Sequence, residues 1–446
     1  MANALQTNFG RANLSSGVGY GGAGDKYELY LKLFSGEMFK GFQHNTIARD
    51  LVTKRTLKNG KSLQFVYTGR MGSEYHTPGT PILGTDKTPV AEKTIVMDDL
   101  LISSAFVYDL DETLSHYDLR GEISRKIGYA LAENYDRKIF RSLVRGARAA
   151  SPVTGNNNDR REPGGTQVGL TDGGLSSPSA SDRAINAPSL VEAFFEAASV
   201  LDEKGVSSDG RVAVLNPRQY YALIQQVGDN GLINRDVQGT GLQSGEGVVS
   251  IAGIKIFKSM NIPFLGKFGT DKATAAGTYK GGDFVGPAVD SGQAESGTYV
   301  ITSNFAVVTA TGHGLSTNDK VTINFTGTAS GLSGVDVAVT KVDADSFKIA
   351  FTNDNTTAAE AVSWNIKGIN NNYGTKEDFA SSCGLIFQKE GAGVVEAIGP
   401  QVQTTSGDVS VIYQGDVILG RLAMGADYLN PAACVELYSG TAGTAF

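Results

Sequence analysis

The sequence has few of the residues from which metal and catalytic sites are usually built. Its 446 residues include 2 cysteines and 4 histidines. Cys383 and Cys434 lie far apart and form no Cys-x-x-Cys pair, which argues against a zinc site and against a disulfide framework. The histidines form neither a His-x-x-x-His nor a His-Glu-x-x-His pair. We therefore expect no metal and no cofactor.

Long hydrophobic runs and a basic excess are also absent. No stretch of about 18 apolar residues occurs, and the N-terminal segment lacks the apolar core of a signal peptide. The net charge is −7. The basic residues Arg137, Lys138, Arg141, Arg145 and Arg148 fall mostly on one side of an expected helix, which we interpret as a solvated face. These features predict a soluble protein from a reducing cytoplasm, with no membrane partner and no sequence-specific nucleic-acid binding.

Glycine, by contrast, is abundant. It accounts for 56 residues, and 41% of the chain is hydrophobic. This combination indicates an ordered protein of two or three domains with many turns and extended segments. Residues 1–56 read as a mobile arm followed by an amphipathic helix. The apolar residues of that helix are Tyr27, Leu31, Phe34, Met38 and Phe42. Residues 57–100 have the composition of a long β-hairpin with an irregular far end.

The strongest periodic signal follows a strand at 100–108 and predicts one long helix over 112–148. At 1.5 Å per residue such a helix is ~55 Å long, and its single apolar stripe suits a structural strut. Nine residues define the stripe: Leu110, Leu114, Leu119, Ile123, Ile127, Leu131, Tyr135, Ile139 and Leu143.

After the helix, residues 149–189 lose all periodicity, and we interpret them as an exposed loop. A helix at 189–205 follows, then a strand, Asn216 as a helix cap and Pro217 as the first residue of a short helix. Two strands flank Gly253. This order predicts an α+β fold. Residues 285–368 carry only short Thr- and Val-rich strands, which predicts a small all-β domain inserted into the α+β part.

One short motif suggests catalysis. The run "VYDLDETL" has the form of the nucleophile motif of the haloacid-dehalogenase phosphatases, with Asp109 as the attacking group. That chemistry also needs a downstream acidic pair for magnesium. The only Asp-Asp pair, Asp98-Asp99, lies upstream of the motif. We therefore interpret Asp109 and Asp111 as caps of the long helix and predict that the protein is not an enzyme.

The order of these pieces resembles that of the major capsid proteins of tailed bacteriophages with the Hong Kong 97-type fold. The resemblance is closest to short-tailed, T7-like phages, and a phage of cyanobacteria is one source that we consider. Six stretches in the same order carry it: "GDKYELYLKLFSGEMFKGF", "NGKSLQFVYTGR", "DDLLISSAFVYDLDETLSHYDLRGE", "GRVAVLNPRQYYALI", "GIKIFKSMNIP" and "RLAMGADYLNPAACVEL".

The resemblance implies a division of the chain into named parts. These are an N-terminal arm and first helix (1–56), an E-loop hairpin (57–100), a peripheral domain (101–205) with its spine helix (112–148), a first axial part (206–284), the β insert (285–368), and a second axial part with C-terminal peripheral strands (369–446). In the hairpin we expect Arg70, Glu74 and Lys87 to contact a neighbouring subunit. For packing of the spine helix we expect Leu119, Ile123, Ile127, Leu131 and Ile139.

The resemblance also implies partners. The chain would assemble with itself into pentamers and hexamers of an icosahedral shell, in the bacterial cytoplasm, and would end in the virion. It would do so with a scaffolding protein and a portal, around double-stranded DNA. Two alternatives remain open from the residues: a phosphatase acting through Asp109, and an adhesin acting through the β insert.

Overall fold

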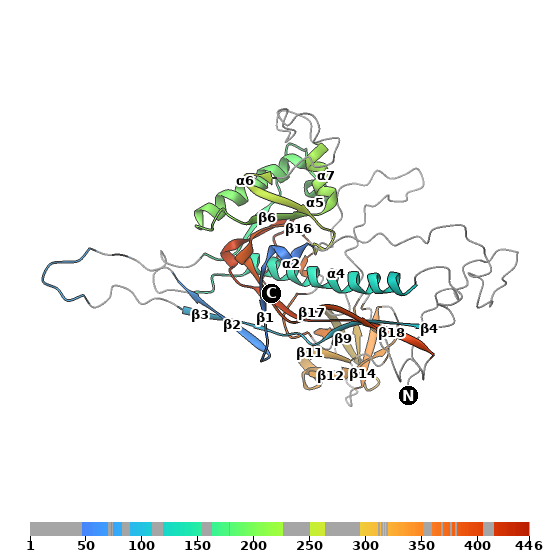
Figure 1. Ribbon diagram of the computed structural model, residues 1–446. Coiled ribbons are helices and arrows are strands. Elements are labelled where there is room, and N and C mark those ends of the chain that lie inside the picture. The colour runs from blue at the N-terminus through green and yellow to red at the C-terminus, as the bar shows by residue number, and fades with distance from the viewer. Residues whose placement is uncertain are drawn as a thin grey trace. The chain divides into compact units, whose positions relative to one another are not determined.

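The computed structural model (Figure 1) describes residues 47–69, 73, 75–82, 90–108, 119–153, 163–177, 179–225, 250–263, 295–310, 313, 315, 317, 320–343, 345–350, 359–366, 369–374, 377–379, 381–404 and 414–445. The expected N-terminal helix lies outside these residues. So do the motif at Asp109 and Asp111 and the first part of the expected long helix, 112–118.

The described chain divides into two compact units. Described residues within 100–135 and 397–424 form unit 1, and those within 47–99, 136–396 and 425–446 form unit 2. The long helix α4 (Leu119–Arg148) contributes to both. The second half of the helix packs with segments that are distant in sequence.

A four-stranded sheet has the strand order β1-β17-β18-β4. Its strands are β1 (Thr53–Thr56), β17 (Ala392–Thr404), β18 (Gly415–Tyr428) and β4 (Leu101–Tyr108). Strand β4 is antiparallel to β18, and β1 is parallel to the start of β17. In unit 1 the first half of α4 lies on β18 at Gly420. A Cβ atom added there would come within 2.4 Å of Ile127 and 2.8 Å of Leu131.

A six-stranded mixed sheet forms much of unit 2, in the order β5-β19-β16-β6-β8-β7. Its strands are β5 (Thr166–Gly169), β6 (Arg211–Leu215), β7 (Ser250–Ile251), β8 (Ile254–Lys258), β16 (Ser382–Gln388) and β19 (Cys434–Tyr438). Three helices pack on it (Figure 1): α5 (Ala180–Ala184), α6 (Ala187–Glu203) and α7 (Pro217–Gln225). The apolar side chains between helices and sheet form one buried core.

The expectation of an exposed loop over 149–189 is wrong for its described second half. Strand β5 pairs in parallel with β19, and Val168 is buried between sheet and helices. Helix α5 starts with a capping box formed by Ser179 and Asp182. The pairing partner of β5 lies more than 260 residues away, so no local pattern could reveal the strand. Strand β19 likewise joins the sheet that contains β6 and β8.

Local predictions around the short helix are confirmed. The side chain of Asn216 accepts a hydrogen bond from the Arg218 N–H at 3.2 Å, and Pro217 is the first residue of α7. Strands β7 and β8 form a hairpin through Ala252 and Gly253, both at positive φ. Such a two-residue turn favours glycine because left-handed backbone costs it nothing.

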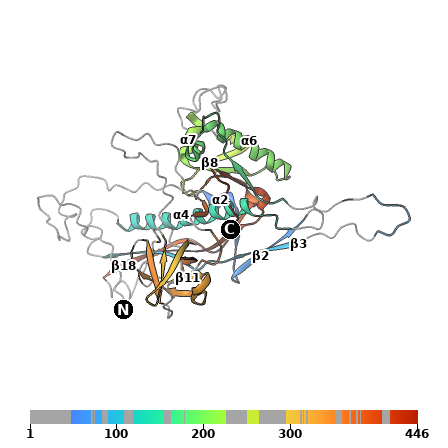
Figure 2. The same cartoon turned by 180° about the vertical axis from the view of Figure 1, so that it is seen from behind.

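The region of the expected β insert contains a separate antiparallel sheet of seven strands (Figure 2), in the order β12-β11-β15-β9-β10-β14-β13. Its strands are β9 (Glu295–Thr302), β10 (Phe305–Thr309), β11 (Lys320–Phe325), β12 (Gly334–Ala338), β13 (Thr340–Lys341), β14 (Ser346–Ala350) and β15 (Glu360–Ile366). One face buries its own apolar core. In that core Phe347 and Trp364 meet edge to face at 5.1 Å between ring centroids. All residues of this core come from the insert itself, as expected for a module added to an existing fold.

Helix packing on Gly420 yields a stability prediction. Gly420→Ala should lower the free energy of unfolding by about 1–3 kcal/mol, because the added methyl group overpacks the contact with Ile127 and Leu131. Gly128→Ala, in the same helix with open space at its Cβ, should instead stabilise by about 0.5–1 kcal/mol. Urea unfolding measures both, and equal effects of the two substitutions would contradict the packing described here.

Candidate functional site

The two faces of the β2–β3 hairpin differ in exposure to solvent. Strands β2 (Ser62–Thr68) and β3 (Val90–Val96) pair only with each other among the described strands. Along both strands exposed residues alternate with partly buried ones. On the exposed face Val66 and Val90 are 68% and 62% accessible. The other face packs on the rest of unit 2 at the root of the hairpin, where Ile95 is fully buried.

The carboxylate of Asp98, just after β3, joins three segments of unit 2. Its Oδ2 accepts from Lys138 Nζ on helix α4 at 3.1 Å and from the Tyr373 hydroxyl at 2.7 Å. Its Oδ1 accepts from the backbone N–H of Asn370 at 2.9 Å and from Asn371 Nδ2 at 3.0 Å. Asp98 is 5% exposed. A buried carboxylate requires such partners, because removing a charge from water is otherwise very costly.

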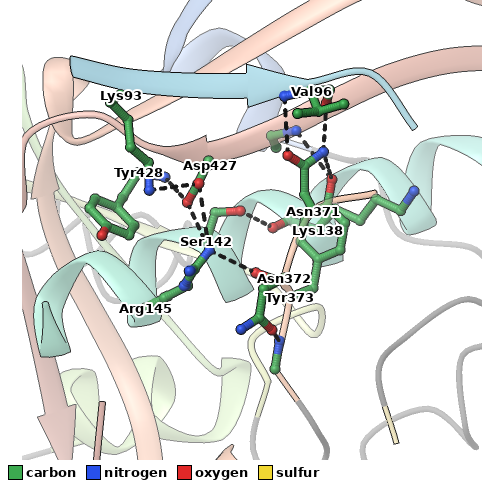
Figure 3. Close-up of polar contacts among 12 residues, drawn as sticks. Lys93, Val96, Lys138, Ser142, Arg145, Asn371, Asn372, Tyr373, Asp427 and Tyr428 are labelled. Carbon is green, nitrogen blue, oxygen red and sulfur yellow. Dashed lines mark hydrogen bonds and ion pairs between the residues drawn. The ribbon is translucent and has the colours of Figure 1, made fainter. Parts of the chain in front are cut away.

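The side chain of Asn371 holds the end of β3 directly (Figure 3). Its Nδ2 donates to the carbonyl of Val96 at 2.6 Å, and its Oδ1 accepts from the Val96 N–H at 3.3 Å. Strand β18 also passes close to this carbonyl at Gly425. A side chain would not fit there, because an added Cβ atom would lie 2.1 Å from the Val96 oxygen. The root of the hairpin is therefore enclosed by backbone on one side and by an amide on the other.

A second carboxylate, that of Asp427 on β18, also links the hairpin to helix α4 (Figure 3). It pairs with Lys93 on β3 at 2.8 Å and with Arg145 on α4 at 3.3 Å. Lys93 also lies over the ring of Tyr428, with its Nζ 3.7 Å from the ring centroid. Arg145 reaches the carbonyl of Asn372 at 3.2 Å. Both ion pairs are largely shielded from solvent, so salt screens them less than surface pairs.

Two tyrosines have hydroxyl groups that are shielded from water: Tyr373 beside Asp98, and Tyr67 near the other end of β2. Burial, followed by the charge of Asp98, raises the pKa of Tyr373 well above its ordinary value. Burial also raises the pKa of Tyr67 on β2, with smaller contributions from Tyr428 and Asp427. The hydroxyl of Tyr67 is buried and finds no hydrogen-bond partner among the described residues. Both hydroxyls therefore stay protonated.

The second half of α4 uses its polar residues to bind other segments of unit 2. Asp136 accepts from the backbone N–H groups of Ile47 and Ala48 at 2.9 and 3.1 Å. Arg148 makes a two-point ion pair with Glu436 on β19 at 2.6 and 2.7 Å, with both side chains almost fully buried. The prediction that this basic face is solvated is therefore wrong for Lys138 and Arg148, because each finds a buried carboxylate.

The residues predicted from sequence lie in several places. Arg70, Glu74 and Lys87 are outside the described residues, as is the side chain of Leu119. Ile127, Leu131 and Ile139 are buried, and Ile123 is partly buried. Sequence reasoning missed the network around Asp98, Asn371 and Asp427. Its members lie up to 334 positions apart, as Lys93 and Asp427 do. The sequence singles out some of them, but as a failed magnesium motif at residues 98–99 and as a solvated basic face that includes Lys138 and Arg145.

Among the described residues, no group of three or more His, Cys, Asp or Glu residues is placed to hold a metal ion. Both cysteines are buried and unpaired, and burial raises the pKa of each thiol, to about 12 for Cys434. No helix in the described part of the chain is long and apolar enough to cross a membrane.

The sequence matches the model of a known protein family. The model of the Gp10A-like major capsid protein family matches residues 64–330. The chain belongs to this family. It is 27% identical over 211 residues to the major capsid protein of Escherichia phage T7, which is 47% of this chain and 60% of the T7 protein. The chain thus spans less than two thirds of the length of this curated relative.

Solved structures confirm the fold class of this capsid protein. The capsid structure of the cyanophage P-SCSP1u matches with a TM-score of 0.60 and 26% identity, over 99% of this chain and 100% of that one. The mature capsid of bacteriophage PhiM1 matches with a TM-score of 0.52 at 14% identity, over 95% and 96%, which concerns the fold alone. The predicted α+β fold of Hong Kong 97 type is therefore confirmed, as is the resemblance to T7-like capsid proteins.

Loss of the Tyr373 hydroxyl should weaken the network. Tyr373→Phe leaves Asp98 Oδ2 and the Ala426 N–H without this partner, so the free energy of unfolding should fall by about 1–3 kcal/mol. Tyr129→Phe, on the partly exposed side of α4, is the control and should change it by less than about 0.5 kcal/mol. Urea unfolding distinguishes the two. Equal stability of Tyr373→Phe and the native protein would contradict the role of the hydroxyl.

The cysteines should be inert in the folded protein. With the pKa of Cys434 raised to about 12 by burial, almost no thiolate forms at pH 8. A thiol-specific disulfide reagent should therefore react with neither cysteine until denaturant is added, and should then react with both. Above the ordinary thiol pKa of about 8.5, only the unfolded state releases these protons, so stability should fall as pH rises. Rapid labelling of the native protein at pH 8 would contradict this.

Proposed function

We propose that the protein is the shell-forming subunit of a phage capsid, a component of the virion with a structural and non-enzymatic role. The observation that carries the proposal is the β2–β3 hairpin, which is fixed at its root and exposed along one face. Membership of the Gp10A-like major capsid protein family supports it, as does the likeness to the cyanophage capsid over the whole chain.

The physical argument concerns the stability of the ribbon. A two-stranded ribbon is marginal in water because it buries little apolar surface. Here Val66 and Val90 remain exposed on it, although the root is held by a buried network. A neighbouring subunit that covers this face would bury both side chains. In a closed shell the same contact recurs at every subunit, so weak contacts add up.

The remaining partners are part of the same proposal. We propose that the shell encloses double-stranded DNA without reading its sequence, in keeping with a net charge of −7, and that a scaffolding protein and a portal take part in assembly. The parts named from the resemblance, from the arm at 1–56 to the strands at 369–446, remain proposals. No finding favours the phosphatase or the adhesin alternative.

Assembly itself tests the proposal. The full chain, expressed with the scaffolding protein of its phage, should sediment as large particles that appear as closed shells in negative-stain electron microscopy. A stable, monodisperse monomer under the same conditions would refute it.

A single charge on the exposed face of the hairpin should block assembly. Val66→Glu places a carboxylate where a neighbouring subunit would bury an apolar side chain, so the yield of closed shells should fall at least about tenfold. The free energy of unfolding of the subunit should fall by less than about 1 kcal/mol, because the site is exposed and the new carboxylate meets only the like charge of Glu92 opposite it on β3.

The matched control for this substitution is Val342→Glu. Val342 is 53% exposed on the β insert, so the chemical change is the same at a site outside the hairpin. Particle yields from sucrose-gradient fractions compare the two variants. Normal yields for Val66→Glu, or equal losses for both, would contradict the assignment of the hairpin face to the subunit contact.

A further inference from the structure

We infer that Asn371 is the positioning residue of the hairpin: its side chain fixes the direction of β3 and ties the exit of the β insert to the hairpin root. The inference rests on the proposed function, because this direction matters when the hairpin has to meet a neighbouring subunit.

The side chain of Asn371 takes the place of a neighbouring strand. On the β2 side, Met97 donates its N–H to the carbonyl of Lys61 at 2.8 Å. Because backbone groups of a strand point to alternate edges, the N–H and C=O of the preceding Val96 face away from β2. Both are met by the amide of Asn371, one as acceptor and one as donor. The amide thus satisfies the backbone N–H and C=O groups at the outer edge of β3, which would otherwise need a partner strand.

Both donor hydrogens of the amide are used in this arrangement. An asparagine side chain offers two donor hydrogens and one acceptor oxygen with two lone pairs. One hydrogen goes to the Val96 carbonyl at 2.6 Å and the other to Asp98 Oδ1 at 3.0 Å, while the oxygen accepts from the Val96 N–H. A carboxylate of the same shape has no donor and would face two oxygen acceptors. The position therefore requires an amide specifically.

The same residue connects the β insert with the hairpin. Strand β15 ends at Ile366, four positions before Asn370, which extended chain spans in at most roughly 14 Å. The backbone N–H groups of Asn370 and Asn371 both donate to Asp98 Oδ1, at 2.9 and 3.3 Å. The chain that leaves the insert is thus fastened to the residue that ends the hairpin.

The test is Asn371→Asp, with Asn186→Asp as its matched control. The amide of Asn186 also donates to two carbonyl oxygens, those of Asp172 and Gly173, at 3.0 and 3.2 Å, but it lies at the start of α6. Both substitutions exchange an amide that serves backbone carbonyls for a carboxylate. Hydrogen exchange of the full chain, read by mass spectrometry, reports on the peptides that cover 90–97 and 369–374.

Asn371→Asp should speed exchange in both peptides by roughly tenfold or more, while Asn186→Asp leaves them unchanged. With its scaffolding protein, Asn371→Asp should also give fewer closed shells and more irregular particles than Asn186→Asp. Unchanged exchange in 90–97, or equal acceleration by both variants, would overturn the inference. Acceleration in 90–97 without 369–374 would overturn the link to the insert. If the native protein itself forms no shells, the proposed function fails, and the exchange result still decides the role of Asn371.

Discussion

The buried carboxylate of Asp98 is the constraint on which the root of the hairpin depends. It brings together the end of β3, the ammonium group of Lys138 on α4 and the chain that follows the β insert. For a carboxylate that is 5% exposed, loss of the charged partner, here Lys138, typically costs about 3–5 kcal/mol. The hairpin, the helix and the chain after the insert therefore stabilise one another.

This constraint explains how one ribbon can be firmly held and still available to a partner. The side chains on the inner face contact the rest of unit 2 in a region shielded from water. There Lys93 binds Asp427 and lies over Tyr428. The opposite face keeps Val66 and Val90 in solvent. A hairpin that is ordered at its root loses less conformational freedom when it meets a neighbour. Holding the root rigid is thus a way to strengthen the contact between subunits without enlarging it.

Local patterns in the sequence predicted the local structure well. The apolar stripe indicates α4, the strand-like composition indicates β2 and β3, and Asn216-Pro217 marks the start of α7. Pairings between distant segments carry no such pattern. Strand β5 was read as loop because its partner β19 lies far along the chain, and Lys138 and Arg148 were read as solvated because their carboxylates belong to other segments. The network around Asp98 is not predicted for the same reason. Its members lie close together in the folded protein but follow no regular spacing in the sequence.

A reconstruction of the assembled particle by cryo-electron microscopy tests the central claim most directly. The account predicts that the face of the hairpin bearing Val66 and Val90 lies against a neighbouring subunit, while Asp98 keeps its contacts with Lys138 and Tyr373 within its own chain. A shell in which this face remains in solvent, or in which the Asp98 contacts are replaced by contacts between subunits, would contradict it.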